Sequence, residues 1–122
     1  MPSKNRENLT RGRESEEAAL NFLQRHGLKL VERNFRCRVG ELDLIMEHDN
    51  ALVFVEVRYR KNDRFGSALE SIDRKKQTRL IRAAGYYLGL NNIDKPARFD
   101  VVAVSPAEKN NCINWIRDAF QA

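Results

Sequence analysis

The sequence lacks a hydrophobic run that could cross a bilayer, which requires about 18 or more consecutive apolar residues. Its first segment, residues 1–13, is polar and basic and has no apolar stretch of the kind found in signal peptides. These two absences argue against a membrane-spanning helix and a membrane partner. They predict a cytoplasmic protein.

Residues that bind zinc or form disulfides are also scarce. The two cysteines, Cys37 and Cys112, lie far apart and outside any Cys-x-x-Cys pattern, and the two histidines, His26 and His48, are isolated from them. A zinc site is therefore not expected. Because disulfides are rare in the cytoplasm, we expect both cysteines to be free thiols.

The chain has no internal repeat and no low-complexity segment. Its 122 residues, 42% hydrophobic and 32% charged, suffice for one core and are too few for two ordinary domains. Residues 1–12 show no apolar periodicity, so we expect a mobile basic tail there. A single domain should follow over residues 13–122.

Positive charge is abundant and unevenly distributed. The net charge is +5, from 22 Lys and Arg against 17 Asp and Glu, and residues 57–82 alone hold nine bases against three acids. A basic segment of this kind suits a protein that binds a phosphate backbone. A solvated surface of a helix explains the same segment equally well.

Hydrophobic periodicity predicts a helix, three strands, a second helix and a fourth strand. The first helix spans residues 13–26, ends at Gly27, and places Glu16 on its buried stripe. The predicted strands are residues 28–35, 41–47, 51–58 and 97–104.

The boundaries near the second helix and the end of the chain are less sharply defined. This helix can start from a capping box at residues 67–70 or from Asp73, and it should end near Gly89. Residues 112–120 are expected to form a short strand around residues 113–116, followed by a helical turn.

Two acidic residues lie on strands that a short loop should fold into a hairpin. With residues 48–51 as the loop, Asp43 lies directly opposite Glu56, and Glu41 lies opposite Arg58 on the same face. Opposed carboxylates repel each other unless a cation lies between them. Ligands that offer only oxygen suit Mg²⁺ or Mn²⁺, so the hairpin predicts a metal site in a phosphodiester enzyme.

The order of elements and several motifs resemble the PD-(D/E)xK nuclease superfamily. More closely, the chain is similar to the YraN family, which is itself similar to Holliday-junction resolvases and restriction endonucleases. The resemblance covers about residues 11–120. The matching motifs are Gly12, Glu16-x-x-Ala19-x-x-Phe22-Leu23, Arg33-Asn34-Phe35-Arg36, Gly40-Glu41-Leu42-Asp43-Leu44-Ile45, Val53-Phe54-Val55-Glu56-Val57-Arg58, Phe65-Gly66, Lys76 with Arg79-Leu80, Ala83-Ala84 with Tyr87-Leu88, and Arg98-Phe99-Asp100-Val101-Val102.

The resemblance implies an α/β fold with a restriction-endonuclease-like αβββαβ core, in which helices flank a mixed central sheet. It implies metal ligands at Asp43, Glu56 and the backbone carbonyl of Val57, with Glu16 completing the acidic cluster. The superfamily's lysine on the third strand is replaced here by Arg58. Because arginine stays protonated, it can orient a phosphate but cannot act as a base. Lys76 or Lys61 could take the lysine's place.

Three functions remain open from the sequence. The first is an endonuclease that uses Mg²⁺ or Mn²⁺ to hydrolyse DNA phosphodiesters, with Glu16, Asp43, Glu56 and Arg58 as catalytic residues. The second is a protein that binds nucleic acid without cutting it, and the third is an interaction domain with structural ion pairs from Glu41 to Arg58 and from Glu56 to Lys76. A homodimer would suit a branched DNA substrate. The predicted nucleic-acid-binding residues are Arg58, Arg60, Lys61, Arg64, Lys75, Lys76 and Arg79.

Overall fold

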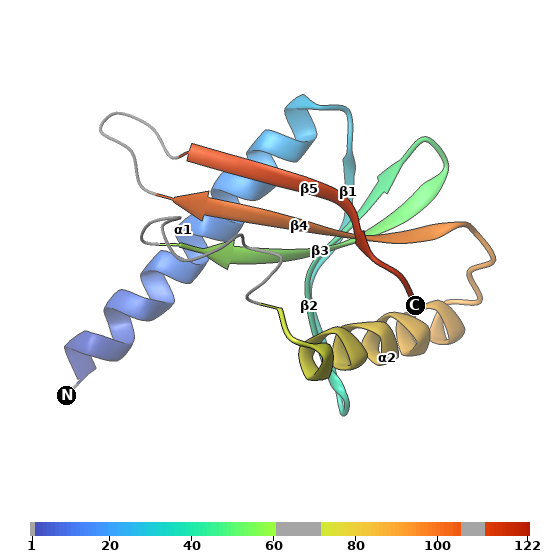
Figure 1. The fold of residues 1–122 in the computed structure, drawn as a ribbon, viewed down its shortest axis with the longest axis horizontal. Helices are drawn as coiled ribbons and strands as arrows, with labels where there is room; N and C mark the ends of the chain where they lie inside the picture. The colour runs from blue at the N-terminus through green and yellow to red at the C-terminus, as the bar shows by residue number, and fades with distance from the viewer. Residues whose placement is uncertain (1, 61–71, 106–111) are drawn as a thin grey trace.

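Two helices flank one mixed sheet in the computed structural model of the chain, which describes residues 2–60, 72–105 and 112–122, with side chains from residue 12 onward (Figure 1). The elements in chain order are α1 (Pro2–Arg25), β1 (Lys29–Cys37), β2 (Gly40–His48), β3 (Ala51–Tyr59), α2 (Arg74–Leu90), β4 (Ala97–Ser105) and β5 (Cys112–Phe120). This order confirms the predicted α/β core with helices on both sides of a mixed sheet.

The sheet has five strands in the order β1-β2-β3-β4-β5. Only β3 and β4 pair in parallel, and α2 makes the crossover between them, as a parallel connection requires. The other neighbouring strands pair antiparallel. Neither helix in the described part of the chain is long and apolar enough to cross a bilayer.

Each face of the sheet is buried beneath one helix. On one face, Ala19, Leu20 and Leu23 of α1 pack with side chains such as Leu44 and Val53. On the other face, a second cluster joins the apolar side of α2 to the sheet and includes Phe54, Leu80, Tyr87 and Phe99. Because β3 contributes to both clusters, it reads as a nearly continuous hydrophobic run.

The hairpin of β2 and β3 has the predicted register. Glu47 pairs with Leu52, as expected, but the loop is shorter than predicted because His48 also pairs with Ala51. The two remaining residues, Asp49 and Asn50, have φ values of 50° and 69°. Two successive positive φ angles are characteristic of the tight type I′ turn, whose twist matches the twist of the strands.

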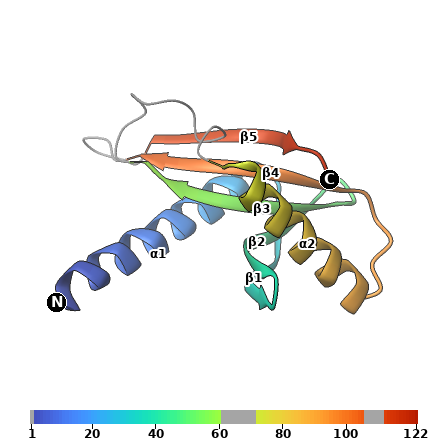
Figure 2. The ribbon, with the colours of Figure 1, turned by 60° about the horizontal axis from the view of Figure 1, so that its bottom comes forward.

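The start of α1 and the end of the sheet differ from the prediction. The helix begins at Pro2 rather than near residue 13, so the backbone of the predicted tail is helical, and its N-terminal half extends beyond the sheet (Figures 1 and 2). The last segment forms one strand, Cys112–Phe120, so the predicted helical turn after residue 116 is wrong.

Capping residues define one end of each helix. The N-cap of α2 is Asp73, whose carboxylate accepts a hydrogen bond from the backbone N–H of Lys76 at 2.8 Å. The alternative capping box at residues 67–70 lies outside the described residues. After α1, Gly27 has a φ of 91°, which confirms the predicted helix stop.

Candidate functional site

The candidate site lies where β2 separates from β3. The paired residues of this hairpin end at Leu44 and Val55, one step before Asp43 and Glu56. From there the outer part of the β1–β2 hairpin projects away from the other three strands (Figures 1 and 2). Leu42 joins the cluster beneath α2, whereas Leu44 joins the cluster beneath α1, so the predicted alternation breaks at Asp43.

Asp43 compensates for part of the broken strand pairing. Its Oδ2 atom accepts a hydrogen bond at 2.9 Å from the backbone N–H of Val57. A side-chain oxygen thus satisfies a backbone donor near the point where β2 and β3 separate. This contact fixes the Asp43 carboxylate beside the third strand and therefore close to Glu56.

Glu56 is a buried carboxylate, with only 6% of its surface exposed. It follows the apolar run of β3, as the sequence predicted. Two cations approach its Oε2 atom: Lys76 Nζ of α2 at 3.6 Å and Arg58 Nε of β3 at 3.4 Å. The predicted contact between Glu56 and Lys76 is therefore confirmed, and α2 supplies a lysine next to the acidic pair.

Burial raises the pKa of both carboxyl groups, and the charge of Asp43 raises that of Glu56 further. Burial and then the neighbouring charge of Asp43 raise the pKa of Glu56 to about 7, against the opposing effects of Lys76 and Arg58. Burial also raises the pKa of Asp43, although the N–H of Val57 opposes this shift. Hydrogen bonding between the two side chains raises the pKa of Glu56 and lowers that of Asp43, so Glu56 is the member of the pair that more readily holds a proton.

Glu16 approaches the pair from α1 and is half-buried. Burial is the main cause of its raised pKa, and the charge of Asp43 contributes next, while Arg33 opposes the shift. The side chain of Asn34 also forms a hydrogen bond with Glu16. Asn34 lies across from Asp43 in β1 with a φ of 53°, a left-handed conformation that asparagine tolerates. Glu16 of α1 and Glu56 of β3 thus each lie within electrostatic reach of Asp43 of β2.

Whether these residues suit a metal ion depends on their chemistry and spacing. Over the described residues, no group of three or more His, Cys, Asp and Glu side chains is arranged to hold a metal ion. The buried carboxylate of Glu56 and the half-buried carboxylate of Asp43 nevertheless form a close pair, and carboxylates are the ligand type that hard cations prefer. The pair fits such a cation, and Glu16 lies outside the immediate pair.

Arg58 does not pair as the sequence suggested. Glu41 forms its ion pair with Arg36, at 3.2 Å, rather than with Arg58. The Nε atom of Arg58 is buried and makes no hydrogen bond to the described residues, although it lies within ion-pair distance of Glu56. A buried guanidinium N–H without a hydrogen-bond acceptor is costly, and the nearby carboxylate of Glu56 offsets part of that cost.

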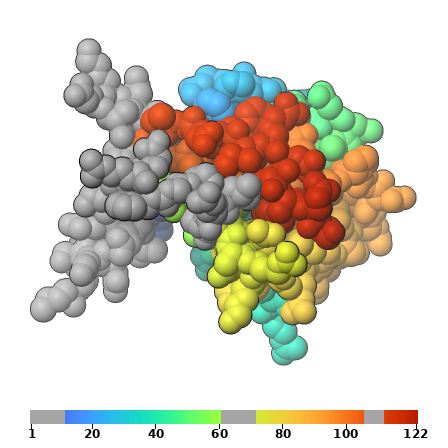
Figure 3. All heavy atoms as spheres, viewed as in Figure 1, coloured from blue at the N-terminus to red at the C-terminus, as the bar shows by residue number. Residues whose placement is uncertain are grey.

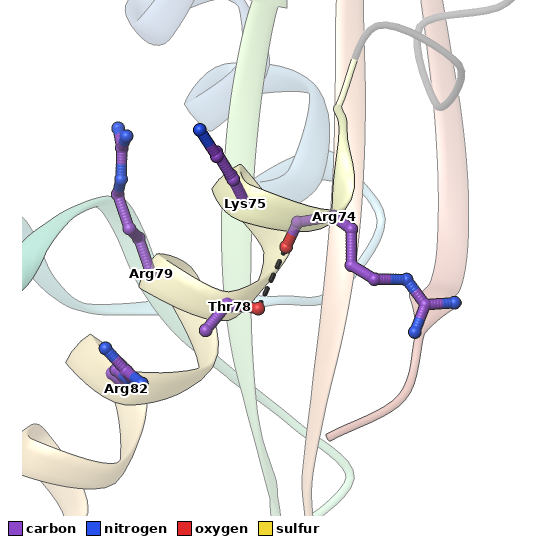
Figure 4. Close-up of a pocket in the computed structure, with 5 residues that line it drawn as sticks. All are labelled: Arg74, Lys75, Thr78, Arg79 and Arg82. Atoms are coloured by element: carbon purple, nitrogen blue, oxygen red, sulfur yellow. Dashed lines mark hydrogen bonds between the residues drawn. The ribbon is translucent and has the colours of Figure 1, made fainter.

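The predicted nucleic-acid-binding residues that the structure describes separate into three groups. Lys75 and Arg79 lie on the exposed side of α2, where they line an open hollow of about 490 Å³ together with Arg74, Thr78 and Arg82 (Figure 4). Lys76 and Arg58 point instead toward Glu56. Arg60 is half-buried after the end of β3, and its backbone N–H donates to Val104. Lys61 and Arg64 lie outside the described residues.

Several basic residues near the site were not among those predicted to bind nucleic acid. Arg74 and Arg82 belong to the basic segment recognised from composition, and their spacing from Thr78 along α2 could have placed them in one hollow. Arg36 and Arg38 line a second hollow, of about 440 Å³, with Arg79. No local pattern could have identified these two, because their proximity to α2 depends on the tertiary fold.

Another buried acid, Asp100, has a structural role. It is fully buried, and its oxygens accept hydrogen bonds from Arg98 Nε at 3.0 Å, Trp115 Nε1 at 2.9 Å and the backbone N–H of Asp118 at 3.0 Å. These donors join β4 to β5 beside an irregularity in their pairing. The buried charge of Asp100 is thus balanced by hydrogen-bond donors, whereas the carboxyl groups of Asp43 and Glu56 lie next to each other.

Comparison with known proteins identifies the family. The model of the uncharacterised protein family UPF0102 matches residues 15–104. A UPF0102 protein of Nitrosococcus oceani is 50% identical over 115 residues, covering 91% of each chain. One from Nitrosomonas europaea is 52% identical over 110 residues, covering 90% of this chain and 92% of its own. One from Stutzerimonas stutzeri is 47% identical over 118 residues, covering 95% and 98%. The chain therefore belongs to the UPF0102 family, known as the YraN family.

Proposed function

We propose that this protein is a metal-dependent endonuclease that hydrolyses DNA phosphodiesters at the Asp43–Glu56 pair. The observation that carries the proposal is the position of the half-buried Asp43 carboxylate, which the backbone N–H of Val57 holds beside the buried carboxyl group of Glu56. Burial and the charge of Asp43 raise the pKa of Glu56 to about 7. Like charges are held this closely where a function requires it, because the arrangement costs stability.

Asp43 and Glu56 would hold Mg²⁺ or Mn²⁺, with Glu16 and the backbone carbonyl of Val57 as the further expected ligands. When bound, such an ion lowers the pKa of a water molecule and offsets negative charge on the phosphate. Asp43 is fixed by the N–H of Val57, so its second oxygen is held in a defined direction. Glu56 is fixed between two cations. Both ligands would thus be oriented before the ion binds.

Arg58 and Lys76 supply positive charge next to the carboxylates. The guanidinium group of Arg58 would orient the scissile phosphate, because its side chain lies beside Glu56 and is 30% exposed. Lys76 would take the role of the superfamily's lysine, although it comes from α2 rather than β3. Together they would stabilise the negative charge that develops during the displacement.

A second function is favoured by a specific observation. Arg58 and Lys76 both lie within ion-pair distance of the same oxygen of Glu56, so the chain itself supplies cationic charge at the position proposed for a metal ion. A protein that binds nucleic acid through this surface and α2, without cutting it, would have the same contacts. In that case Arg58 would neutralise a degenerate site.

A cleavage assay with a matched variant distinguishes the two functions. Purified protein is incubated with Mn²⁺ or Mg²⁺ and labelled duplex, flapped or four-way-junction DNA, beside Asp43→Asn, which keeps an oxygen acceptor for the N–H of Val57. We expect metal-dependent cutting by the wild type and a loss of at least about 100-fold in the variant. Equal cutting by both proteins would indicate a contaminant. Tight binding without cutting would support the second function.

A direct measurement of metal binding tests the site without relying on activity. Titration of Mn²⁺ followed by calorimetry or by the paramagnetic relaxation of water should detect binding to the wild type. Asp43→Asn and Glu56→Gln should each weaken that binding at least about tenfold, because each removes one carboxylate ligand. Unchanged Mn²⁺ affinity in both variants would refute the assignment of the ligands.

A further inference from the structure

One face of α2 carries three exposed cations and an exposed aromatic ring in a row. Lys75, Arg79, Arg82 and Tyr86 are spaced by four, three and four residues, which places them on one side of a helix. All four are exposed, and Tyr86 is 55% exposed. The buried residues of α2 lie on a different side, so the row is not needed to attach the helix to the sheet. We call these four residues the α2 row.

The cations of the α2 row are available to a ligand. None of the three forms an ion pair with a carboxylate anywhere in the described chain. They line the hollow of about 490 Å³, in which Lys75 and Arg79 extend to the same side of the helix and Arg74 to the other (Figure 4). Lys75, the first residue of the row, precedes Lys76 in α2, and Lys76 reaches Glu56 of the carboxylate pair.

The tip of the β1–β2 hairpin extends this basic surface. Arg79 also lines the second hollow, of about 440 Å³, with Arg36 and Arg38 at the tip. The tip packs closely on the helix, because a Cβ atom at Gly40 would lie 3.4 Å from the carbonyl oxygen of Arg79. In the space-filling view the tip protrudes beyond α2 (Figure 3). The two hollows therefore meet at Arg79 and form one basic groove.

Tyr86 adds an exposed aromatic ring to the α2 row, one helical turn after Arg82. Its ring lies 6.3 Å from the ring of Phe35 on β1, at an interplanar angle of 33°. This neighbour supports the ring from the protein side, while more than half of the residue remains exposed to solvent. A supported and exposed ring is suited to stacking against a flat ligand.

We infer that the α2 row binds an unpaired strand of nucleic acid adjacent to the carboxylate pair, with phosphates on Lys75, Arg79 and Arg82 and an unstacked base on Tyr86. The inference rests on the proposed function and specifies its substrate class. Basic grooves that end in stacking aromatics are typical of single-strand binding. In an intact duplex each internal base already stacks on both of its neighbours, so apart from its two terminal pairs a blunt duplex offers Tyr86 no partner.

Binding without metal tests this inference independently of cleavage. Fluorescence anisotropy in EDTA compares a blunt duplex with a duplex that carries a single-stranded overhang, at equal total nucleotide content. We expect the wild type to prefer the overhang about tenfold, and Tyr86→Ala to lose that preference while binding the blunt duplex normally. Tyr86→Phe should keep the preference, because it keeps the ring.

Two control variants test whether the loss of preference is specific to the ring of Tyr86. Leu90→Ala shortens another exposed apolar side chain of α2, 61% exposed, and should leave both affinities unchanged. Arg79→Ala should weaken binding to both ligands about equally, because phosphates are present in both. Circular dichroism melting of each variant checks folding.

The outcomes separate this inference from the proposed function. Equal binding of both ligands by the wild type, or an undiminished preference in Tyr86→Ala, would overturn the α2 row as a single-strand site even if the protein cuts DNA. A preference that depends on Tyr86 would uphold it even if no DNA is cut, and the carboxylate pair would then belong to a binding protein.

Discussion

At the scale of single residues, the most unusual feature of the protein is the carboxyl group of Glu56, whose affinity for a proton increases when the chain folds. Glu56 is buried against Asp43, and its pKa rises from 4.5 to about 7. The folded protein therefore binds more protons than the unfolded chain between about pH 4.5 and 7. Because stability falls with rising pH wherever the folded state binds more protons, this pair destabilises the fold progressively across that range.

The first prediction follows from this loss of stability with rising pH. Glu56→Gln removes the titrating group and keeps its size, so the variant should be more stable than the wild type at pH 8, by about 1–3 kcal/mol, with a smaller difference at pH 5. Urea denaturation at both pH values measures the difference. A variant that is equally destabilised at both pH values would show that Glu56 is held mainly by its ion pairs with Lys76 and Arg58.

A second prediction separates two roles of Asp43. Asp43→Ala removes the acceptor for the N–H of Val57 and should cost about 1–2 kcal/mol of stability, whereas Asp43→Asn keeps an acceptor and should cost less. Both variants should lose metal-dependent activity. Denaturant midpoints and cleavage rates, measured on the same preparations, test this combination. Equal stability losses would mean that the hydrogen bond to Val57 contributes little.

At the scale of elements, the strength of local signals determined which predictions held. The register of β2 and β3 was predictable because both strands alternate and a short loop joins them. The break in this alternation at Asp43 was not predictable. Leu42 and Leu44 lie on opposite faces of the sheet because the whole β1–β2 hairpin bends there, and such a bend depends on the tertiary fold. The pairing of Glu41 with Arg36 was missed for a related reason: β1 and β2 place these residues opposite each other.

The ends of the chain contained weaker signals. Residues 2–12 have few apolar side chains, so periodicity could not reveal that α1 begins at Pro2. In β5 the pairing with β4 is irregular between Phe99 and Val101, and Asp118 has a φ of 50°. Such an interruption resembles the end of a strand in sequence, although Asp100 holds the segment in the sheet by accepting the N–H of Asp118.

Asp100 provides the third prediction, which concerns the attachment of β5. Asp100→Ala leaves Arg98, Trp115 and the N–H of Asp118 without their shared acceptor, so it should destabilise the protein by about 3–5 kcal/mol. Hydrogen exchange should show faster exchange in β5 than in β3. A variant with normal stability would mean that water replaces the carboxylate at little cost.

At the scale of the whole molecule, the fold concentrates opposite charges on adjacent surfaces. The sheet and α1 supply Glu16, Asp43 and Glu56, while α2 and the tip of the β1–β2 hairpin supply the basic groove. The crossover from β3 to β4 places the start of α2 next to Glu56, because Lys76 reaches this residue. A polyanion attracted to the groove would therefore be led to the carboxylate pair.

The salt dependence of DNA binding tests whether the phosphates contact the basic groove rather than the acidic site. Each phosphate that the protein no longer neutralises reduces the slope of log K against log salt by about 0.7–0.9. Lys75→Ala and Arg79→Ala should each weaken DNA binding and flatten the slope by the equivalent of about one phosphate, because their side chains have no acidic partner in the described chain. Lys76→Ala should change the slope less, because Lys76 already has a carboxylate partner in Glu56.

Two other outcomes would contradict this prediction. If all three variants flatten the slope equally, Lys76 must leave Glu56 and contact a phosphate when DNA binds. If none does, the phosphates lie on another surface, and the basic groove is not the binding site.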